Sequence, residues 1–254
     1  MHEHDDHEGQ RVSRRRIIAG AGSVGFGALI AAASTGSATA RSVDGGQVPV
    51  RPLDARIDPA VFDGVGACQL TKAAMEGPYW FDAKKIRSDI REDKRGTLLR
   101  VAIKVQDRNC NPIPNAVAEI WHCDHMGAYS GFDRARVGPF PATDPQTPTR
   151  YLRGAQVTDA NGAVEFVTIW PGWYPGRCVH IHNMFHVNKR RVLTTQTYFD
   201  ETLNSSVHAE APYTEHKGNR TRNEQDSIFL PEGIMKVTRE ADGWRAVAVF
   251  TVPT

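Results

Sequence analysis

The sequence lacks an excess of charge of either sign. Its 254 residues include 31 Lys and Arg against 29 Asp and Glu, which gives a formal net charge of +2. A chain balanced in this way has no general electrostatic attraction to nucleic acid or to an anionic membrane surface. We therefore expect neither as a partner.

Cysteine is also scarce, with four residues in the whole chain. That number is too small for the disulfide scaffold of a minimal secreted domain. None of Cys68, Cys110, Cys123 and Cys178 lies at C-x-x-C spacing, so the signal for a thiolate metal site is weak. In an oxidising compartment these residues could form up to two disulfides in three connectivities. The sequence does not choose among them.

Helical periodicity is the third thing that the chain has little of. No stretch keeps a 3.6-residue apolar period for more than about two turns, and there is no internal repeat. Short strand patterns recur instead, which predicts an all-β fold, an antiparallel β-sandwich with irregular loops, over residues 61–254. Residues 41–60 are polar and aperiodic, which indicates a linker or arm. The expected strands cover residues 99–106, 116–123, 164–170, 178–187, 192–199, 235–238 and 244–252.

Two of these strand patterns are especially clear. Leu99, Val101, Ile103 and Val105 alternate with residues such as Arg100, Lys104 and Gln106, which predicts a half-buried strand. Near the C-terminus, Asp242-Gly243 between two strand patterns predicts a hairpin.

The first forty residues have the organisation of a targeting segment. Arg14-Arg15 precedes a weakly apolar, Gly- and Ala-rich stretch from Ile17 to Ala33, and Ala38-Thr39-Ala40 offers small residues for cleavage. The stretch is too short and too rich in glycine for a stable membrane anchor. We therefore expect residues 1–40 to be a cleavable twin-arginine export signal, with the mature protein extracellular or in the cell envelope.

The sharpest local motif is His180-Ile181-His182. Residues two apart on a strand point to the same face of the sheet, so both imidazoles could reach one metal ion. Taken alone, an H-x-H pair is more often two ordinary surface histidines. The residues around it shift that balance.

Two tyrosines lie in loops next to expected strands, where functional residues are often carried. Trp170-Pro171-Gly172-Trp173-Tyr174-Pro175-Gly176-Arg177 is a rigid turn whose prolines fix backbone angles and whose glycines permit close approach. Such a turn can aim Tyr174 and Arg177 into a site. Tyr129 follows the strand of residues 116–123 after a short loop. Either tyrosine alone would more often be a buried structural residue.

Together, two tyrosines and two histidines form a distinctive set of candidate ligands. Phenolate is a hard anionic oxygen donor that favours iron(III), and imidazole suits iron as well as zinc or copper. The set also differs from the two-histidine-one-carboxylate pattern of iron(II) oxygenases.

The chain resembles the intradiol ring-cleavage dioxygenases, the family of protocatechuate 3,4-dioxygenase and catechol 1,2-dioxygenase. The resemblance runs from Cys68 to Phe229. It is carried by Leu70-Thr71, Glu76-Gly77-Pro78-Tyr79, the run from Pro112 to Tyr129, the run from Thr168 to His182, and Thr195-Gln196-Thr197-Tyr198-Phe199.

The resemblance implies that Tyr129, Tyr174, His180 and His182 bind Fe(III) and that Tyr174 also accepts a proton from the substrate. It further implies that Arg177 is an active-site arginine and that Gln196 lies near the substrate. The expected reaction is intradiol cleavage of a catechol or polyphenol by O2 to a muconate-type diacid. His122, His125 and His186 are not expected to be ligands.

One departure from the family concerns the connection between Tyr174 and His180. Only five residues intervene, whereas family members that act on soluble aromatics usually have a longer loop. The shorter connection should leave the metal more open. The export signal and the cysteines fit a secreted branch of the family better than its cytoplasmic enzymes.

Two other functions fit parts of the pattern. A non-catalytic β-sandwich binding module could carry the same strands, since fold does not prove function. A zinc or copper protein could use the same histidines. A binding module, however, has no need for all four candidate ligands.

Overall fold

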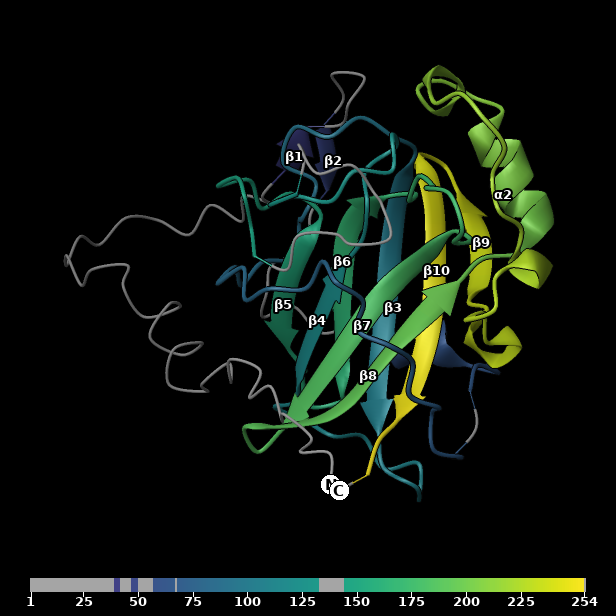
Figure 1. Cartoon of the computed structure of the whole chain (residues 1–254). Coiled ribbons are helices and arrows are strands. Elements are labelled where there is room, and N and C mark those ends of the chain that lie inside the picture. Colours follow the sequence, from purple (N-terminus) through teal and green to yellow (C-terminus); the bar gives the residue numbers. More distant parts are fainter. Residues whose placement is uncertain (1–38, 42–46, 50–56, 67, 133–143, 254) are drawn as a thin grey trace, which may run out of the picture.

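Two four-stranded sheets stacked face to face form the body of the protein (Figure 1). This computed structural model describes residues 39–41, 47–49, 57–66, 68–132 and 144–253. One sheet has the order β6-β3-β10-β9 and the other the order β5-β4-β7-β8. The strands of the first are β6 (Ala163–Ile169), β3 (Leu98–Gln106), β10 (Gly243–Thr251) and β9 (Lys236–Glu240). Those of the second are β5 (Arg153–Val157), β4 (Val117–Trp121), β7 (His180–Val187) and β8 (Arg190–Tyr198).

The remaining described elements are short. They are the paired strands β1 (Thr39–Arg41) and β2 (Gln47–Pro49), the helix α2 (Glu201–His208), and the 3-10 turns η1 (Pro59–Phe62), η2 (Tyr213–Glu215), η3 (Asn223–Gln225) and η4 (Pro231–Gly233). Among the described residues, no helix has the length and apolarity to cross a bilayer. Of the predicted export signal, residues 1–38 lie outside the described part of the chain.

The main core lies between the two sheets. The alternating apolar side chains of β3 are fully buried there, together with Ile181 and Phe185 of β7 and Phe250 of β10. Because successive side chains of a strand point to opposite faces, placing Ile181 in this core turns its two histidine neighbours to the outer face of their sheet. The pattern of the sequence thus fixes which face of β7 carries the candidate ligands.

The sequence predicted an antiparallel sandwich, but one pair of strands is parallel. β10 pairs with β3 in parallel, with Trp244 opposite Leu99 and Thr251 opposite Gln106. The predicted β9–β10 hairpin is confirmed as an antiparallel pair. The side-chain alternation of a strand specifies its buried face but not the direction of its neighbour, which is why the parallel pair was not predicted.

The strand β3 is buried on both faces, and the prediction of a half-buried strand was wrong on this point. Its second face is covered by the segment that contains η1, whose Phe62 packs with Ile57 and Ala102. Arg100, predicted to face solvent, is buried and forms ion pairs with Glu240 and Asp242.

The other strand predictions hold to within a few residues at their ends, but β5 and α2 were not predicted. The helix begins after Asp200, whose carboxylate accepts hydrogen bonds from Thr202 N (2.8 Å) and Leu203 N (3.3 Å). Side-chain capping of this kind satisfies amide groups that lack partners at the start of a helix. In Figure 1, α2 lies beyond the β9 side of the sandwich.

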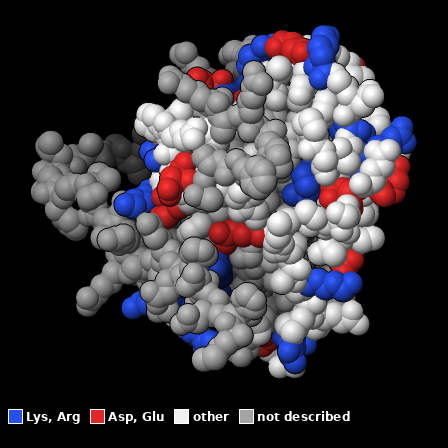
Figure 2. All heavy atoms as spheres, viewed as in Figure 1, with Lys and Arg blue, Asp and Glu red and all other residues white. Residues whose placement is uncertain are grey.

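One disulfide is present, between Cys68 and Cys110, whose Cα atoms are 5.2 Å apart. Cys123 and Cys178 are buried free thiols. The bond ties the chain before Gln69 to the turn after β3. On the face of the molecule drawn in Figure 2, side chains of both charge signs are intermixed, in keeping with the balanced composition.

Candidate metal centre

Strand β7 presents His180 and His182 side by side on the outer face of its sheet. His180 lies opposite Tyr198 on β8, and His182 lies between Trp121 of β4 and Gln196 of β8. Both histidine side chains are buried. Neighbouring strands on each side therefore fix the backbone from which the two imidazoles project.

Tyr129 lies at the end of a tight loop that follows β4. The carboxylate of Asp124 accepts hydrogen bonds from Met126 N and Ala128 N, both at 3.0 Å, which closes the loop on itself. Its other oxygen accepts a hydrogen bond from Lys94 Nζ at 3.1 Å. This bonding gives the loop one conformation and points Tyr129 at the histidines.

The loop that carries Tyr174 packs directly against the loop that carries Tyr129. A Cβ atom on Gly127 would lie 2.2 Å from Trp173 O, and one on Gly172 would lie 2.3 Å from Asp124 O. Only glycine permits backbones to approach this closely. The close approach predicted for Gly172 is therefore confirmed. Gly176 has open space around it and instead adopts a positive φ of 87°.

The four predicted ligands converge on one point. Tyr129 Oη and Tyr174 Oη each lie 3.2 Å from His180 Nε2, and His182 Nε2 lies 3.1 Å from the same atom. Donor atoms about 2.1 Å from one ion and at right angles to each other are about 3 Å apart. The observed separations are therefore those of neighbouring ligands on a single ion.

The hydrogen-bonding pattern also fits a cation. His180 Nδ1 lies 2.6 Å from Cys178 O, so this nitrogen donates and Nε2 carries only a lone pair. That lone pair is approached by two phenol oxygens and a second imidazole nitrogen. One lone pair cannot accept hydrogen bonds from all three groups at once. A metal ion bound to the four atoms removes this conflict.

Burial keeps the four groups in their neutral forms when they have no metal. Burial, reinforced by the Arg177 charge, lowers the pKa of His180 to about 3, and burial lowers the pKa of His182 well below its usual value. Burial raises the pKa of Tyr129 and Tyr174 above the ordinary value of a phenol. Neutral imidazoles are ready ligands, and a bound trivalent cation would favour the phenolates.

The three histidines not expected to be ligands lie apart from this centre. Both ring nitrogens of His122 are engaged, with Cys123 O at 2.8 Å and Thr168 Oγ1 at 2.7 Å. His125 lies 3.8 Å from Glu215. His186 lies further along β7, beyond a register shift. In the described part of the chain, His, Cys, Asp and Glu alone form no group of three placed to hold a metal, so a centre here needs the tyrosines.

Arg177 and Gln196 contact each other beside the ligand set. Arg177 Nη2 donates a hydrogen bond to Gln196 Oε1, and Arg177 Nε donates one to Asp226 Oδ2 at 3.0 Å. Gln196 Nε2 donates to Met75 O at 2.9 Å. The structure therefore brings all six predicted site residues into one region.

Aromatic rings and a buried arginine enclose the ligands. Tyr79 stacks on Tyr129 with ring centroids 4.7 Å apart, and Trp121 stacks on His182 at 4.8 Å. Arg153 is buried, donates to Ser130 Oγ and Ser130 O, and lies 5.8 Å from the Tyr129 ring centre. A cation over the face of a ring is attracted by its electrons and would favour a phenolate.

The sequence did not indicate Asp226, Arg153 or Trp121 as parts of the site. Asp226 is separated by 49 residues from Arg177, and no motif links the two. Trp121 lies within the quoted family motif but reads there as an ordinary strand aromatic. These residues can be assigned to the site only from the three-dimensional structure, which brings distant segments of the chain together.

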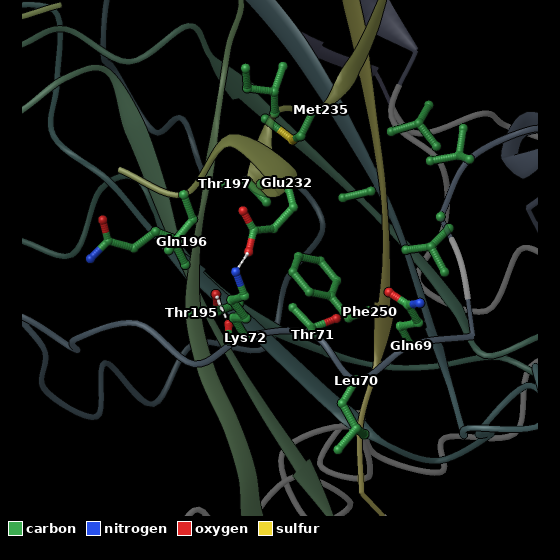
Figure 3. A pocket seen from close by; sticks show the side chains of 18 residues that line it. Gln69, Leu70, Thr71, Lys72, Thr195, Gln196, Thr197, Glu232, Met235 and Phe250 are labelled. Carbon is green, nitrogen blue, oxygen red and sulfur yellow. Dashed lines mark hydrogen bonds and ion pairs between the residues drawn. The ribbon is translucent and has the colours of Figure 1, made fainter. Parts of the chain in front are cut away.

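A cavity of about 590 Å³ lies on the other side of β8 from the ligands. Thr195 and Thr197 line it, together with Phe250 of the facing sheet. Figure 3 shows the Gln196 side chain pointing away from the cavity and the Lys72–Glu232 ion pair at it. The ligands project from the opposite face of the sheet, so we place the chemistry at the four donor atoms and not in this cavity.

A model of a dioxygenase family matches residues 75–212, more than half of the chain. The chain belongs to the intradiol ring-cleavage dioxygenase family. It is similar to an intradiol ring-cleavage dioxygenase from Tetranychus urticae, with 36% identity and a TM-score of 0.68 over 73% of this chain and 94% of that chain. The dioxygenase domain of a fusion protein from Streptomyces sp. SirexAA-E is 29% identical, with a TM-score of 0.55 over 72% and 97% of the two chains.

Curated relatives include a chlorocatechol 1,2-dioxygenase from Rhodococcus opacus, 29% identical over 51% of this chain and 56% of the relative. A catechol 1,2-dioxygenase from Acinetobacter baylyi is 29% identical over 57% of this chain and 50% of the relative. The chain therefore spans about half the length of the curated relatives it matches. Family membership and fold follow from these comparisons.

Proposed function

We propose that the chain uses iron(III) to cleave a catechol-type diol between its two hydroxyl-bearing carbons with O2, giving a muconate-type diacid. Tyr129, Tyr174, His180 and His182 would hold the ion. The observation that carries this proposal is the convergence of four donor atoms, with three of them 3.1–3.2 Å from His180 Nε2. The names of the curated relatives support the same reaction class.

The donor set supports iron over zinc or copper. Two phenol oxygens become hard anionic donors when they lose their protons, and such donors favour a hard trivalent ion. Bound iron(III) would supply Lewis acidity and a template that holds the diol. The other contributions come from side chains of this chain.

Arg177 supplies positive charge next to the ligands. Its side chain is only 13% exposed, and it is fixed by Asp226 and Gln196. A preorganised cation in a site shielded from water stabilises negative charge that develops during the reaction. We assign Arg177 this role toward the ring-opening transition state, with Gln196 beside the substrate.

Tyr174 is suited to accept a proton from the incoming diol. It is the most exposed of the four ligands, at 8%, and its backbone pairs with that of Arg177 in a short bridge. Because burial raises the pKa of this phenol, its oxygen holds a proton firmly once it has received one. Tyr129, at 2% exposure, is more deeply buried and would hold the ion together with the histidines.

We also propose that the mature protein is exported to the extracellular space or the cell envelope. The twin-arginine pattern at Arg14-Arg15 indicates export, and the Cys68–Cys110 disulfide is typical of an oxidising compartment. Replacing both arginines with lysine should keep the protein in the cytoplasm. Mature protein outside the cell in that variant would contradict the proposal.

The reaction is tested with the purified, iron-loaded chain, catechol and ¹⁸O2. We expect cis,cis-muconate that carries both oxygen atoms, and a red-brown protein from tyrosinate-to-iron charge transfer. Tyr129→Phe should weaken that colour, whereas His122→Gln should leave it unchanged. A yellow semialdehyde would indicate extradiol cleavage and overturn the proposal. Full zinc occupancy without iron-dependent activity would favour a zinc protein, and failure to bind any metal would favour a binding module.

A further inference from the structure

A single buried carboxylate receives three hydrogen bonds beside the candidate metal centre. Asp226, whose side chain is 1% exposed, accepts from Arg177 Nε at 3.0 Å and from Cys178 N at 3.0 Å, both through Oδ2. Its Oδ1 accepts from Ile228 N at 2.9 Å within its own turn. Two of the three donors, Arg177 and Cys178, thus belong to the short connection between Tyr174 and His180.

The guanidinium of Arg177 is held on two sides. The carboxylate of Asp226 accepts a hydrogen bond from Nε, and the side-chain oxygen of Gln196 accepts one from Nη2. Tyr198 Oη lies 3.3 Å from Gln196 Oε1 and 3.1 Å from Ile228 O, so it lies between Gln196 and the turn that follows Asp226. An arginine side chain has several rotatable bonds and keeps one direction only when such partners fix it.

The same carboxylate also reaches a candidate ligand through the backbone. Asp226 binds the amide of Cys178, and the carbonyl of Cys178 is the hydrogen-bond partner of His180 Nδ1 at 2.6 Å. A group that fixes the second nitrogen of a metal-binding histidine sets its tautomer and its direction. Asp226 therefore holds the residue whose carbonyl is paired with His180.

We propose that Asp226 is a positioning residue that orients Arg177 toward the substrate at the candidate metal centre. This inference rests on the proposed function, because Arg177 acts there on the bound diol. Asp226 has no donor atom in the ligand set and acts through Arg177. Its negative charge also balances a cation that is largely buried, so its loss would let Arg177 turn toward solvent.

The test compares Asp226→Asn with the wild-type, iron-loaded chain. Asparagine has the same shape but no charge, and its amide oxygen can still accept the hydrogen bond from Cys178 N that supports His180. We expect iron content and the charge-transfer band to stay as in the wild type, while kcat falls roughly 10- to 100-fold, as small displacements of a catalytic group can cause. Asp200→Asn is the matched control, because the carboxylate of Asp200 caps α2 by accepting hydrogen bonds from Thr202 N and Leu203 N. That variant should keep the wild-type kcat.

A double variant separates positioning from a general structural role. If Asp226 acts through Arg177, Asp226→Asn should have little further effect once Arg177→Ala is present. Multiplicative losses in the double variant, or wild-type kcat in Asp226→Asn, would overturn the inference. Should Asp226→Asn fold poorly, Asp226→Glu retains the charge and displaces the carboxylate. It should fold and lose activity, and a wild-type kcat in that variant would also overturn the inference.

A crystal structure of Asp226→Asn gives a readout that does not depend on activity. We expect the Arg177 guanidinium to leave Gln196 Oε1, and an unmoved guanidinium would contradict the inference. Absence of catechol cleavage by the wild type would instead count against the proposed function, and the position of Arg177 would still test the role of Asp226.

Discussion

The indole of Trp121 lies flat against the imidazole of His182, with ring centroids 4.8 Å apart and an interplanar angle of 5°. The two residues are direct partners across β4 and β7. His182 Nδ1 has no hydrogen-bond partner among the described residues, so this ring differs from His180, whose Nδ1 is bonded. Stacking on Trp121 is therefore a main restraint on the direction of His182.

Trp121→Leu should lower iron affinity about ten-fold, as loss of a group that supports a metal ligand typically does. It should also lower the free energy of unfolding by about 3 kcal/mol, because a large buried ring is removed. Trp170→Leu is the matched control, since Trp170 is fully buried in the core and packs against Phe199, with ring centroids 4.3 Å apart. It should lose similar stability but keep wild-type iron affinity. Equal iron affinity in both variants would show that the stack does not support His182. Iron titration and denaturant unfolding provide the two measurements.

Gly77 also lies close to the imidazole of His182. A Cβ atom there would be 3.2 Å from His182 Cε1, and the residue has φ +75°. Gly77→Ala should therefore displace the ring by a few tenths of an ångström and reduce iron affinity. The positive φ adds a cost of about 1–2 kcal/mol for any side chain. Gly64→Ala isolates that cost, because Gly64 has φ +69° and open space around it. If both variants bind iron as the wild type does, the contact with His182 is unimportant.

The residues that could be assigned from sequence are those whose meaning is local. His180 and His182 share a face because they are two apart on a strand, and Ile181 between them supplies the apolar partner. Tyr129 and Tyr174 follow from loops next to strands and from the family motifs. The β9–β10 hairpin followed from Asp242-Gly243. In each case, a few neighbouring residues contain the whole signal.

What the sequence could not show are relationships between distant segments. The parallel pairing of β10 with β3 joins residues about 145 positions apart, and alternation is the same for either direction. The buried state of Arg100 depends on one carboxylate at the end of β9, Glu240, and one in the turn after it, Asp242. Likewise, the disulfide partner of Cys68 was one of three possibilities, and only the packing of its segment beside the turn after β3 selects Cys110.

The Cys68–Cys110 disulfide should stabilise the domain without affecting the metal centre. It closes a loop with a sequence separation of 42 residues, for which loss of the bond costs roughly 2–4 kcal/mol. A Cys68→Ser/Cys110→Ser variant should show this loss in denaturant unfolding and bind iron as the wild type does. Reduction should destabilise the wild type and leave the variant unchanged. Equal stability of the wild type before and after reduction would contradict the prediction.

Burial of His122 should make the protein less stable in acid. Burial lowers the pKa of His122 to about 4, whereas an unfolded histidine titrates near 6.5. Between these pH values the unfolded chain takes up a proton that the folded chain does not. The contribution of His122 to the free energy of unfolding therefore falls as pH falls from about 6.5 to about 4, by at most about 1.4 kcal/mol per pH unit. The folded ring stays neutral because it is buried, and this outweighs its hydrogen bond to Cys123 O, which by itself raises the pKa.

His122→Gln removes this titration and keeps a polar side chain. Its unfolding free energy will be lower at pH 8, since the two hydrogen bonds are altered, but its decline between pH 6.5 and 4 should be shallower by up to one proton. Comparison of slopes, and not of absolute stabilities, isolates the histidine. His186 and His208 also have a pKa lowered to about 4 by burial, so the variant should retain part of the acid sensitivity. Parallel slopes for wild type and His122→Gln would mean that His122 is already protonated in the folded protein over this range, and that burial does not hold its ring in the neutral form.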